Sequence, residues 1–256
     1  MPLVTIGKQQ IYYELSGQPA EKPFLLLIHG AGGSHLDWPE ELRHLPDTAV
    51  ITPDLPGHGR TPPPAHSTIT AYADDIQVFI EKLGLAQVIV AGHSMGGAIA
   101  QELAIRGVPQ LVGLVLVGTG AKLRVSPALL EMLETDFVTA VAAVPQYAFA
   151  PNAPDSLRQA HQSRLAQNDA AVVYGDFAAC DVFDVREQLG QISVPTLVIS
   201  GSEDVMTPSK YGRYLADHIP HAEFVLIENA GHMMALEQPD EVATAVIRQF
   251  LDKMDR

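Results

Sequence analysis

A serine with the spacing of a catalytic nucleophile stands at position 94, within the run Gly-His-Ser-Met-Gly-Gly of residues 92–97. The apolar run 88–91 before it predicts a buried strand, and the helix-forming run 98–104 after it predicts a helix. A serine in such a tight turn projects its hydroxyl above the sheet, because flanking glycines let strand and helix approach closely. Ser94 is therefore a candidate nucleophile, although a serine that caps a helix after a glycine turn has the same pattern.

A base and an acid that could activate Ser94 follow later apolar runs. Asp204 follows the run 196–200, and His232 follows the run 223–227. A serine hydroxyl needs a base within hydrogen-bond reach, and a catalytic histidine needs a carboxylate that fixes its tautomer. Parallel strands present their carboxyl ends at one edge of a sheet, and the chain order serine, acid, histidine is that of one hydrolase architecture. The predicted catalytic residues are Ser94, Asp204 and His232.

The acid has one competitor, Glu203, which is the preceding residue. Adjacent residues cannot both face the same histidine, and we favour Asp204. No acid follows the apolar run 111–117, so the other place where an acid could stand is empty.

The remaining histidines are weaker candidates for a base, although His232 taken alone could be an ordinary loop residue. His29 and His93 lie in two turns and are expected to support the backbone there, and His58 is expected to have a structural role. The others are expected on the surface: His35, His44, His66, His161, His218 and His221.

Two backbone N–H groups are needed to stabilise an oxyanion. Met95 supplies one by its position after Ser94, beside a helix N-terminus. The second should come from the glycine-rich loop 29–34, where we favour Ala31 over Gly32. A phosphate-binding loop is the alternative for 29–34, but the run lacks both a Lys-Ser/Thr ending and dinucleotide spacing.

Strand and helix patterns alternate along most of the chain, which predicts a mostly parallel sheet with helices on both faces. Strands are expected at 4–6, 11–15, 24–28, 49–54, 88–91, 111–117, 196–200 and 223–227, and helices at 38–44, 70–83, 98–104, 209–219 and 240–251. The alternation breaks in residues 121–191, where helices are expected at 127–137, 156–167 and 170–179. We therefore predict a core of residues 1–120 and 192–256 with a helical cap, 121–191, inserted into it.

The composition restricts the class of protein. The 256 residues carry 30 acidic and 16 basic side chains, a net charge of −14, so a nucleic-acid partner is not expected. The single cysteine, Cys180, allows no internal disulfide and is expected to pack. Residues 1–6 show no secretory signal and no apolar run spans a bilayer, which favours a cytoplasmic protein without a membrane partner. No ligand spacing for a metal is present, and the oligomeric state stays open between monomer and homodimer.

The pattern resembles the α/β-hydrolase superfamily over nearly the whole chain. Five segments carry the resemblance: 29–34, 54–59, 92–97, 201–204 and 231–232. The resemblance implies an eight-stranded, mostly parallel sheet with the cap after the sixth strand, and two-step acyl transfer without a cofactor. It is strongest to small carboxylesterases, enol-lactonases and carbon–carbon-bond hydrolases, whereas dehalogenases and epoxide hydrolases have Asp in place of Ser94.

The substrate is less constrained than the chemistry. We expect hydrolysis of small to medium carboxylic esters; the alternatives are a lactonase or carbon–carbon-bond hydrolase of ring-cleavage products, and a slow ligand receptor on the same fold. Candidate pocket residues are Gly32, Val205, Met233 and Phe177. The cap contains further aromatic residues that could reach the substrate: Phe137, Tyr147, Phe149, Tyr174 and Phe183. The alternative substrates carry carboxylates, for which the candidate cations are Lys122, Arg124, Arg158, Arg164 and Arg186.

Overall fold

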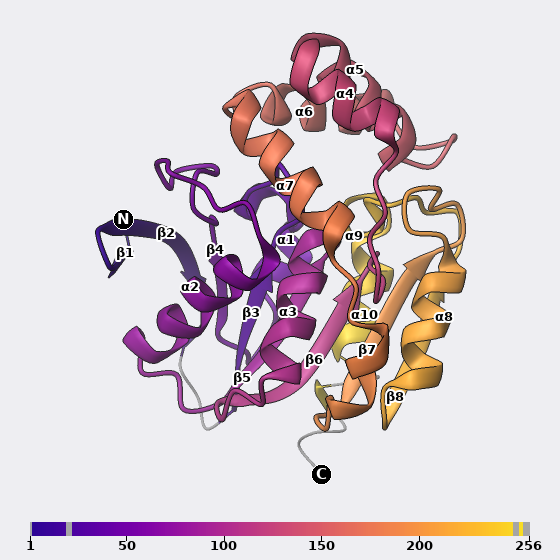
Figure 1. Cartoon of the computed structure of the whole chain (residues 1–256). Coiled ribbons are helices and arrows are strands. Elements are labelled where there is room, and N and C mark those ends of the chain that lie inside the picture. The colour runs from indigo at the N-terminus through magenta and orange to yellow at the C-terminus, as the bar shows by residue number, and fades with distance from the viewer. Residues whose placement is uncertain (1, 19–21, 248–250, 253–256) are drawn as a thin grey trace.

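Eight strands form one twisted sheet in the computed structural model, which describes residues 2–18, 22–247 and 251–252 (Figure 1). Their order across the sheet is β1-β2-β4-β3-β5-β6-β7-β8. The strands are β1 (Leu3–Ile6), β2 (Gln9–Ser16), β3 (Phe24–Ile28), β4 (Val50–Pro53), β5 (Val88–His93), β6 (Leu111–Val117), β7 (Thr196–Gly201) and β8 (Ala222–Ile227). The predicted eight-stranded α/β fold is confirmed.

The strands β4, β3, β5, β6, β7 and β8 pair in parallel, whereas β2 pairs antiparallel with both β1 and β4. β3 lies between β4 and β5, so the chain leaves it in one direction across the sheet and later returns on its other side. In an open α/β sheet, ligands bind beyond the carboxyl ends of the strands at such a reversal. The loops after β3 and β5 therefore meet at the place where a site is expected.

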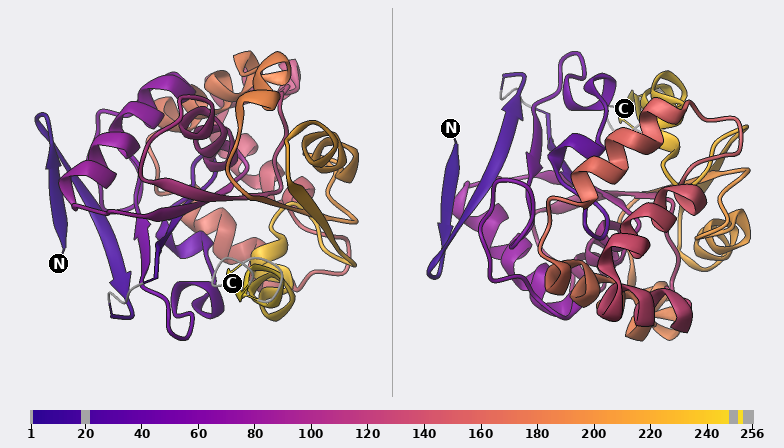
Figure 2. Two further views of the ribbon diagram at one scale, coloured as in Figure 1. Left: turned by 90° about the horizontal axis from the view of Figure 1, so that it is seen from below. Right: turned by 90° about the horizontal axis from the view of Figure 1, so that it is seen from above.

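Helices cover both faces of the sheet (Figure 2). One apolar core joins the sheet to α2, α3 and α8, through residues such as Phe79, Leu103 and Leu215. The other core joins it to α1, α9 and α10, through residues such as Trp38 and Val246. These helices span α1 (Glu40–Arg43), α2 (Ile69–Lys82), α3 (Met95–Ile105), α8 (Ser209–His218), α9 (Met234–Glu237) and α10 (Pro239–Val246), with short 3₁₀ turns η1 (His35–Asp37) and η2 (Arg186–Gln191).

Four further helices lie together beyond one end of the sheet (Figure 1). In the chain they stand between β6 and β7. They are α4 (Pro127–Thr135), α5 (Phe137–Ala148), α6 (Asp155–Leu165) and α7 (Ala170–Val182). The sequence predicted three helices here and missed α5, whose run of Ala and Val contains Pro145, a residue that usually ends helices. Asp136 separates α4 from α5, because its side chain accepts the Thr139 N–H and starts the second helix.

The chain enters and leaves this helical segment at neighbouring positions. The Val185 N–H donates to the Ala121 carbonyl at 2.8 Å, and Lys122 and Asp184 form an isolated β-bridge. Phe183 and Cys180 belong to the same apolar core as the sheet, so the base of the segment is packed into the main body. The buried position of Cys180 fits packing.

Smaller differences concern boundaries. The predicted helix 38–44 starts only at Glu40, after Pro39, and β5 continues to His93 rather than ending at 91. α10 ends at Val246, and residues 248–250 of the predicted helix 240–251 lie outside the described residues. Within the described part of the chain, no helix combines the length and the apolar character needed to cross a membrane.

Candidate active site

Ser94 occupies a strained turn between β5 and α3. Its backbone has φ 52° and ψ −114°, a conformation that non-glycine residues rarely adopt. A Cβ on Gly92 would lie 2.1 Å from the carbonyl oxygen of Gly96, and a Cβ on Gly96 would lie 2.3 Å from that of Ile28. Both glycines are therefore required by the close approach of strand and helix, and the turn places Ser94 at the carboxyl edge of the sheet.

His232 and Asp204 form a buried pair beside this turn. The His232 Nδ1 donates to Asp204 Oδ2 at 2.9 Å, and the Thr207 hydroxyl donates to the same oxygen at 2.8 Å. The other oxygen, Oδ1, accepts the N–H groups of Met206 and Thr207. Burial alone would raise the pKa of Asp204, but the charge of His232 and these hydrogen bonds outweigh burial and lower that pKa. Asp204 is thus held ionised against His232, and the exposed Glu203 lies outside this arrangement.

His93 and His29 hold the backbone around the site. His93 Nε2 donates to the carbonyl of His232 at 2.9 Å, and His29 accepts the Leu55 N–H at 3.0 Å. Burial lowers the pKa of His93 to about 3, with a contribution from His232, and that of His29 to about 4, with a contribution from His58. Both rings are neutral near pH 7 and bind backbone groups.

A cavity of about 720 Å³, open to solvent, contains Ser94 and His232 in its lining. Its walls come from both the sheet and the helical segment, and Met233 and Phe177 are among them. Several of the other wall residues are apolar, among them Leu123, Val125, Val144, Ala148 and Met206. The mixture of apolar walls with a few polar groups is the character expected of a site for a small organic substrate.

The structure separates the two candidates for the second oxyanion donor. The Gly32 N–H donates to Asp176 Oδ2 at 2.8 Å and is already engaged. Ala31 lines the cavity together with Ser94, and Met95 is the first residue of α3. Ala31 and Met95 stay the predicted oxyanion donors.

Two predicted pocket residues lie elsewhere. Val205 is 64% exposed, because the turn in which the Met206 N–H binds Asp204 directs the Val205 side chain outward. The neighbouring side chain, Met206, lines the cavity. Gly32 packs against Leu165 and Val173 of the helical segment. Of the other aromatics, Tyr147 is 61% exposed, and Phe137, Phe149, Tyr174 and Phe183 pack in apolar clusters.

Among the cavity residues that were not predicted from the sequence are Asp37 and His161. His161 was expected on the surface but is 8% exposed, and its Nδ1 has no hydrogen-bond partner among the described residues. Asp37 accepts two hydrogen bonds from Arg164, at 2.8 and 3.1 Å. Burial would raise the pKa of Asp37, but the positive charges of His161 and Arg164 lower it.

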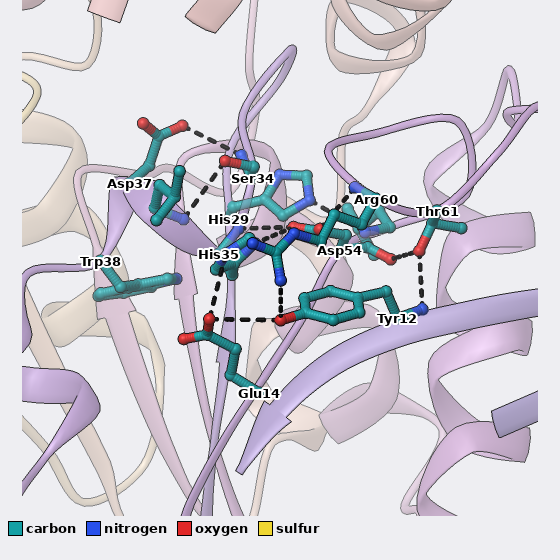
Figure 3. Close-up of polar contacts among 12 residues, drawn as sticks. Tyr12, Glu14, His29, Ser34, His35, Asp37, Trp38, Asp54, Arg60 and Thr61 are labelled. Atoms are coloured by element: carbon teal, nitrogen blue, oxygen red, sulfur yellow. Dashed lines mark hydrogen bonds and ion pairs between the residues drawn. The ribbon is translucent and has the colours of Figure 1, made fainter. Parts of the chain in front are cut away.

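His35 is the second histidine that was wrongly expected on the surface (Figure 3). Its backbone N–H and its Nδ1 both donate to Asp54 Oδ1, at 2.7 and 2.8 Å. The other Asp54 oxygen accepts the Arg60 N–H, and Thr61 donates to the Asp54 carbonyl. Asp54 thereby joins the loops after β3 and β4, which position Ala31.

Asp176 of α7 joins the helical segment to the main body. It accepts hydrogen bonds from the Tyr72 hydroxyl and His58 Nε2, each at 2.7 Å, besides the Gly32 N–H. Asp176 and His58 are both fully buried. The segment therefore fixes the glycine-rich loop directly, through one carboxylate.

Comparison with known proteins agrees with this architecture. The sequence model of a family described as "Alpha/beta hydrolase family" matches residues 25–245. A relative from Agrobacterium fabrum, named as carbamate hydrolase RutD, is 32% identical and covers 96% of this chain and 100% of its own length. The 3-oxoadipate enol-lactonase 2 of Acinetobacter baylyi is 28% identical, with 93% of each chain covered. The structure of a thermophilic esterase matches with a TM-score of 0.86 and 32% identity, over 98% of this chain and 97% of the esterase.

Proposed function

The chain belongs to the alpha/beta hydrolase family, and from that premise we propose that it hydrolyses small to medium carboxylic esters through an acyl-enzyme on Ser94. The observation that carries the proposal is the buried His232–Asp204 pair, because His232 lines the same cavity as the strained Ser94. A serine with a base and an orienting acid is the set of groups that acyl transfer requires.

In the proposed reaction, Ser94 Oγ attacks the ester carbonyl carbon while His232 takes the hydroxyl proton. The N–H groups of Ala31 and Met95 donate to the oxyanion that forms on the carbonyl oxygen. Collapse of this intermediate breaks the bond to the alcohol, which leaves with the proton from His232. Water, deprotonated by His232, then attacks the acyl-enzyme carbonyl, and release of the carboxylic acid restores Ser94.

The helical segment 121–191 has the proposed role of a cap over this chemistry. It contributes Leu123, Val144 and Phe177 to the cavity wall, which would exclude water and select acyl groups by size. Lactone hydrolysis is a second candidate for the same groups, because the relative from Acinetobacter baylyi is named an enol-lactonase. A lactone differs only in that its leaving alcohol stays attached to the acyl group.

The test is hydrolysis of 4-nitrophenyl esters, from acetate to long acyl chains, by the native chain, by Ser94→Ala and by Ser202→Ala. Ser202 is the matched control because it also follows a strand at this edge, where it accepts the Asn229 N–H. We expect turnover of the short esters that Ser94→Ala abolishes and Ser202→Ala retains. Labelling of Ser94 by a fluorophosphonate, read by peptide mass spectrometry, gives an independent check. Turnover that survives in folded Ser94→Ala would contradict the assignment.

A further inference from the structure

A second cavity adjoins the catalytic one and is strongly basic. We call it the basic vestibule, and its main lining residues are Lys122, Arg124, Arg186, Lys210, Tyr211 and Tyr214. Arg124 and Tyr211 line both cavities, so the two are neighbours that share a wall. Lys122 and Arg124 lie just before α4, and Arg186 is the first residue of η2, which follows α7. Lys210 comes from α8.

The charge of the vestibule is opposite to that of the molecule. The chain has 16 Lys and Arg against 30 Asp and Glu, and four of those cations gather here. Two carboxylates contact them: Asp184 binds Lys122 and Arg186 at 2.9 and 2.8 Å, and Asp181 binds Arg124 at 3.2 Å. Local positive charge on an otherwise acidic protein raises the concentration of anions at that place.

The ion pairs account for some of these cations but not for all of their charge. Hydrogen bonds from Arg186 and Lys122 hold the pKa of Asp184 well below its usual range, so one carboxylate fixes two cations. Arg124 is 64% exposed at its side chain, at the boundary with the catalytic cavity. Lys210 lies over the Tyr211 ring at 5.8 Å and has no carboxylate within ion-pair distance among the described residues. A purely structural salt-bridge cluster would also place a carboxylate beside Lys210, and among the described residues none pairs with it.

We propose that the basic vestibule binds a carboxylate on the substrate, so that the natural esters are acidic ones. The reacting carbonyl lies at Ser94 and the carboxylate extends past Tyr211 to Arg124 and Lys210. This inference rests on the proposed function and adds the substrate class to it. The apolar walls of the catalytic cavity accommodate the carbon chain between the two groups.

The experiment compares two pairs of esters that differ in one charge. On the acyl side, mono-4-nitrophenyl adipate is compared with 4-nitrophenyl hexanoate, and on the leaving side, 4-carboxyphenyl butyrate with 4-carbamoylphenyl butyrate. At low ionic strength we expect a higher kcat/KM for the acidic member of at least one pair. In Arg124→Gln and Lys210→Gln the acidic-to-neutral ratio should fall about fivefold each, as for exposed ion pairs, and 0.5 M NaCl should reduce it in the native chain. The control is Arg213→Gln, on the same helix as Lys210 but packed over Phe224, which should keep the native ratio.

A native chain with no preference for either acidic ester, or variants that change acidic and neutral esters equally, would overturn the vestibule while leaving the esterase proposal intact. Absence of all turnover would count against the esterase proposal instead. In that case calorimetry decides: adipate should bind native chain more tightly than hexanoate, and Arg124→Gln/Lys210→Gln should remove the difference. Equal binding of the two acids would overturn the inference.

Discussion

Two of the buried histidine–aspartate pairs in this molecule have nearly the same geometry and different consequences. His232 and Asp204 approach to 2.9 Å, and His58 and Asp176 to 2.7 Å. The two ring nitrogens of His58 face two acceptors, Asp176 and the Pro56 carbonyl, so both nitrogens donate and the ring carries a charge. Burial lowers the pKa of His58, but Asp176, the Pro56 carbonyl and Asp54 together raise it by more.

His232 differs because only Nδ1 binds a carboxylate, and the residue lines the cavity that contains Ser94. A ring with one nitrogen oriented and the other available can accept a proton, whereas a ring that donates from both nitrogens is fixed. The comparison shows that a buried His–Asp pair does not indicate catalysis by itself. What distinguishes the pair that we propose to be catalytic is an available ring nitrogen beside the candidate nucleophile, Ser94.

Removal of the acid from the catalytic pair should have the largest effect. Asp204→Asn should lower kcat for 4-nitrophenyl butyrate by about 10³- to 10⁴-fold, because an amide no longer holds the reactive His232 tautomer. Glu203→Gln is the control, since Glu203 is exposed and should leave kcat unchanged. Urea unfolding should show that Asp204→Asn is folded. A loss of less than tenfold would show that another group orients His232.

Breaking the other pair should affect stability first. Asp176→Asn leaves the charged His58 buried without its partner, and the free energy of unfolding should fall by about 3–5 kcal/mol. The matched control is Asp75→Asn, because Asp75 binds His66 at the same 2.7 Å distance but both side chains are partly exposed. That control should cost about 1 kcal/mol or less in urea unfolding. Equal losses in the two variants would contradict the importance of burial.

Acid should destabilise the chain through the neutral histidines. The folded pKa values of His93 and His29, about 3 and about 4, lie below the unfolded value, so the unfolded state takes up protons that the folded state does not. Each should remove about 2 kcal/mol of stability between pH 7 and pH 5. His58, whose folded pKa is raised, has the opposite sign: its contribution is complete below the unfolded pKa and is lost as pH rises through the folded one. Urea unfolding at the two pH values measures the net change, and His93→Gln should reduce it.

The smallest effect should come from the hydroxyl that supports the catalytic pair. Thr207→Val removes a hydrogen bond to Asp204 and a neighbour 3.1 Å from His232 Nδ1, while it preserves the shape of the side chain. We expect kcat to fall by about three- to tenfold, with about 1 kcal/mol lost in stability. Thr119→Val provides a comparison, since the Thr119 hydroxyl donates to the Ser94 carbonyl and not to the pair. Identical kinetics in Thr207→Val and the native chain would remove Thr207 from the site.

The sequence predicted the strands and the Ser94 turn well because these features are local. The run 24–28 is apolar throughout, and the need for glycine at position 92 has a local steric cause, the Gly96 carbonyl. The positions of Asp204 and His232 followed from one rule, that parallel strands end at a common edge. Features that do not depend on packing against distant residues could therefore be predicted from the sequence.

The buried polar residues could not be predicted in the same way, because their partners are distant in sequence. Asp176 binds Gly32 and His58, which are 144 and 118 positions away. A local signal existed nevertheless: His161 stands four residues from both Leu157 and Leu165, on the apolar face of α6. A polar residue at such a position indicates a buried site, and the same spacing places Asp176 on the apolar face of α7.

The adjacent ends of the helical segment have a consequence for evolution and design. An insertion whose two ends already lie together, as Ala121 and Val185 do, can be exchanged for another of different length without moving the strand that precedes Ser94. Substrate range can then change by recombination in one step, while the reaction chemistry is inherited unchanged. One constraint that a replacement has to meet is a carboxylate in the place of Asp176, since that carboxylate accepts the Gly32 N–H of the glycine-rich loop.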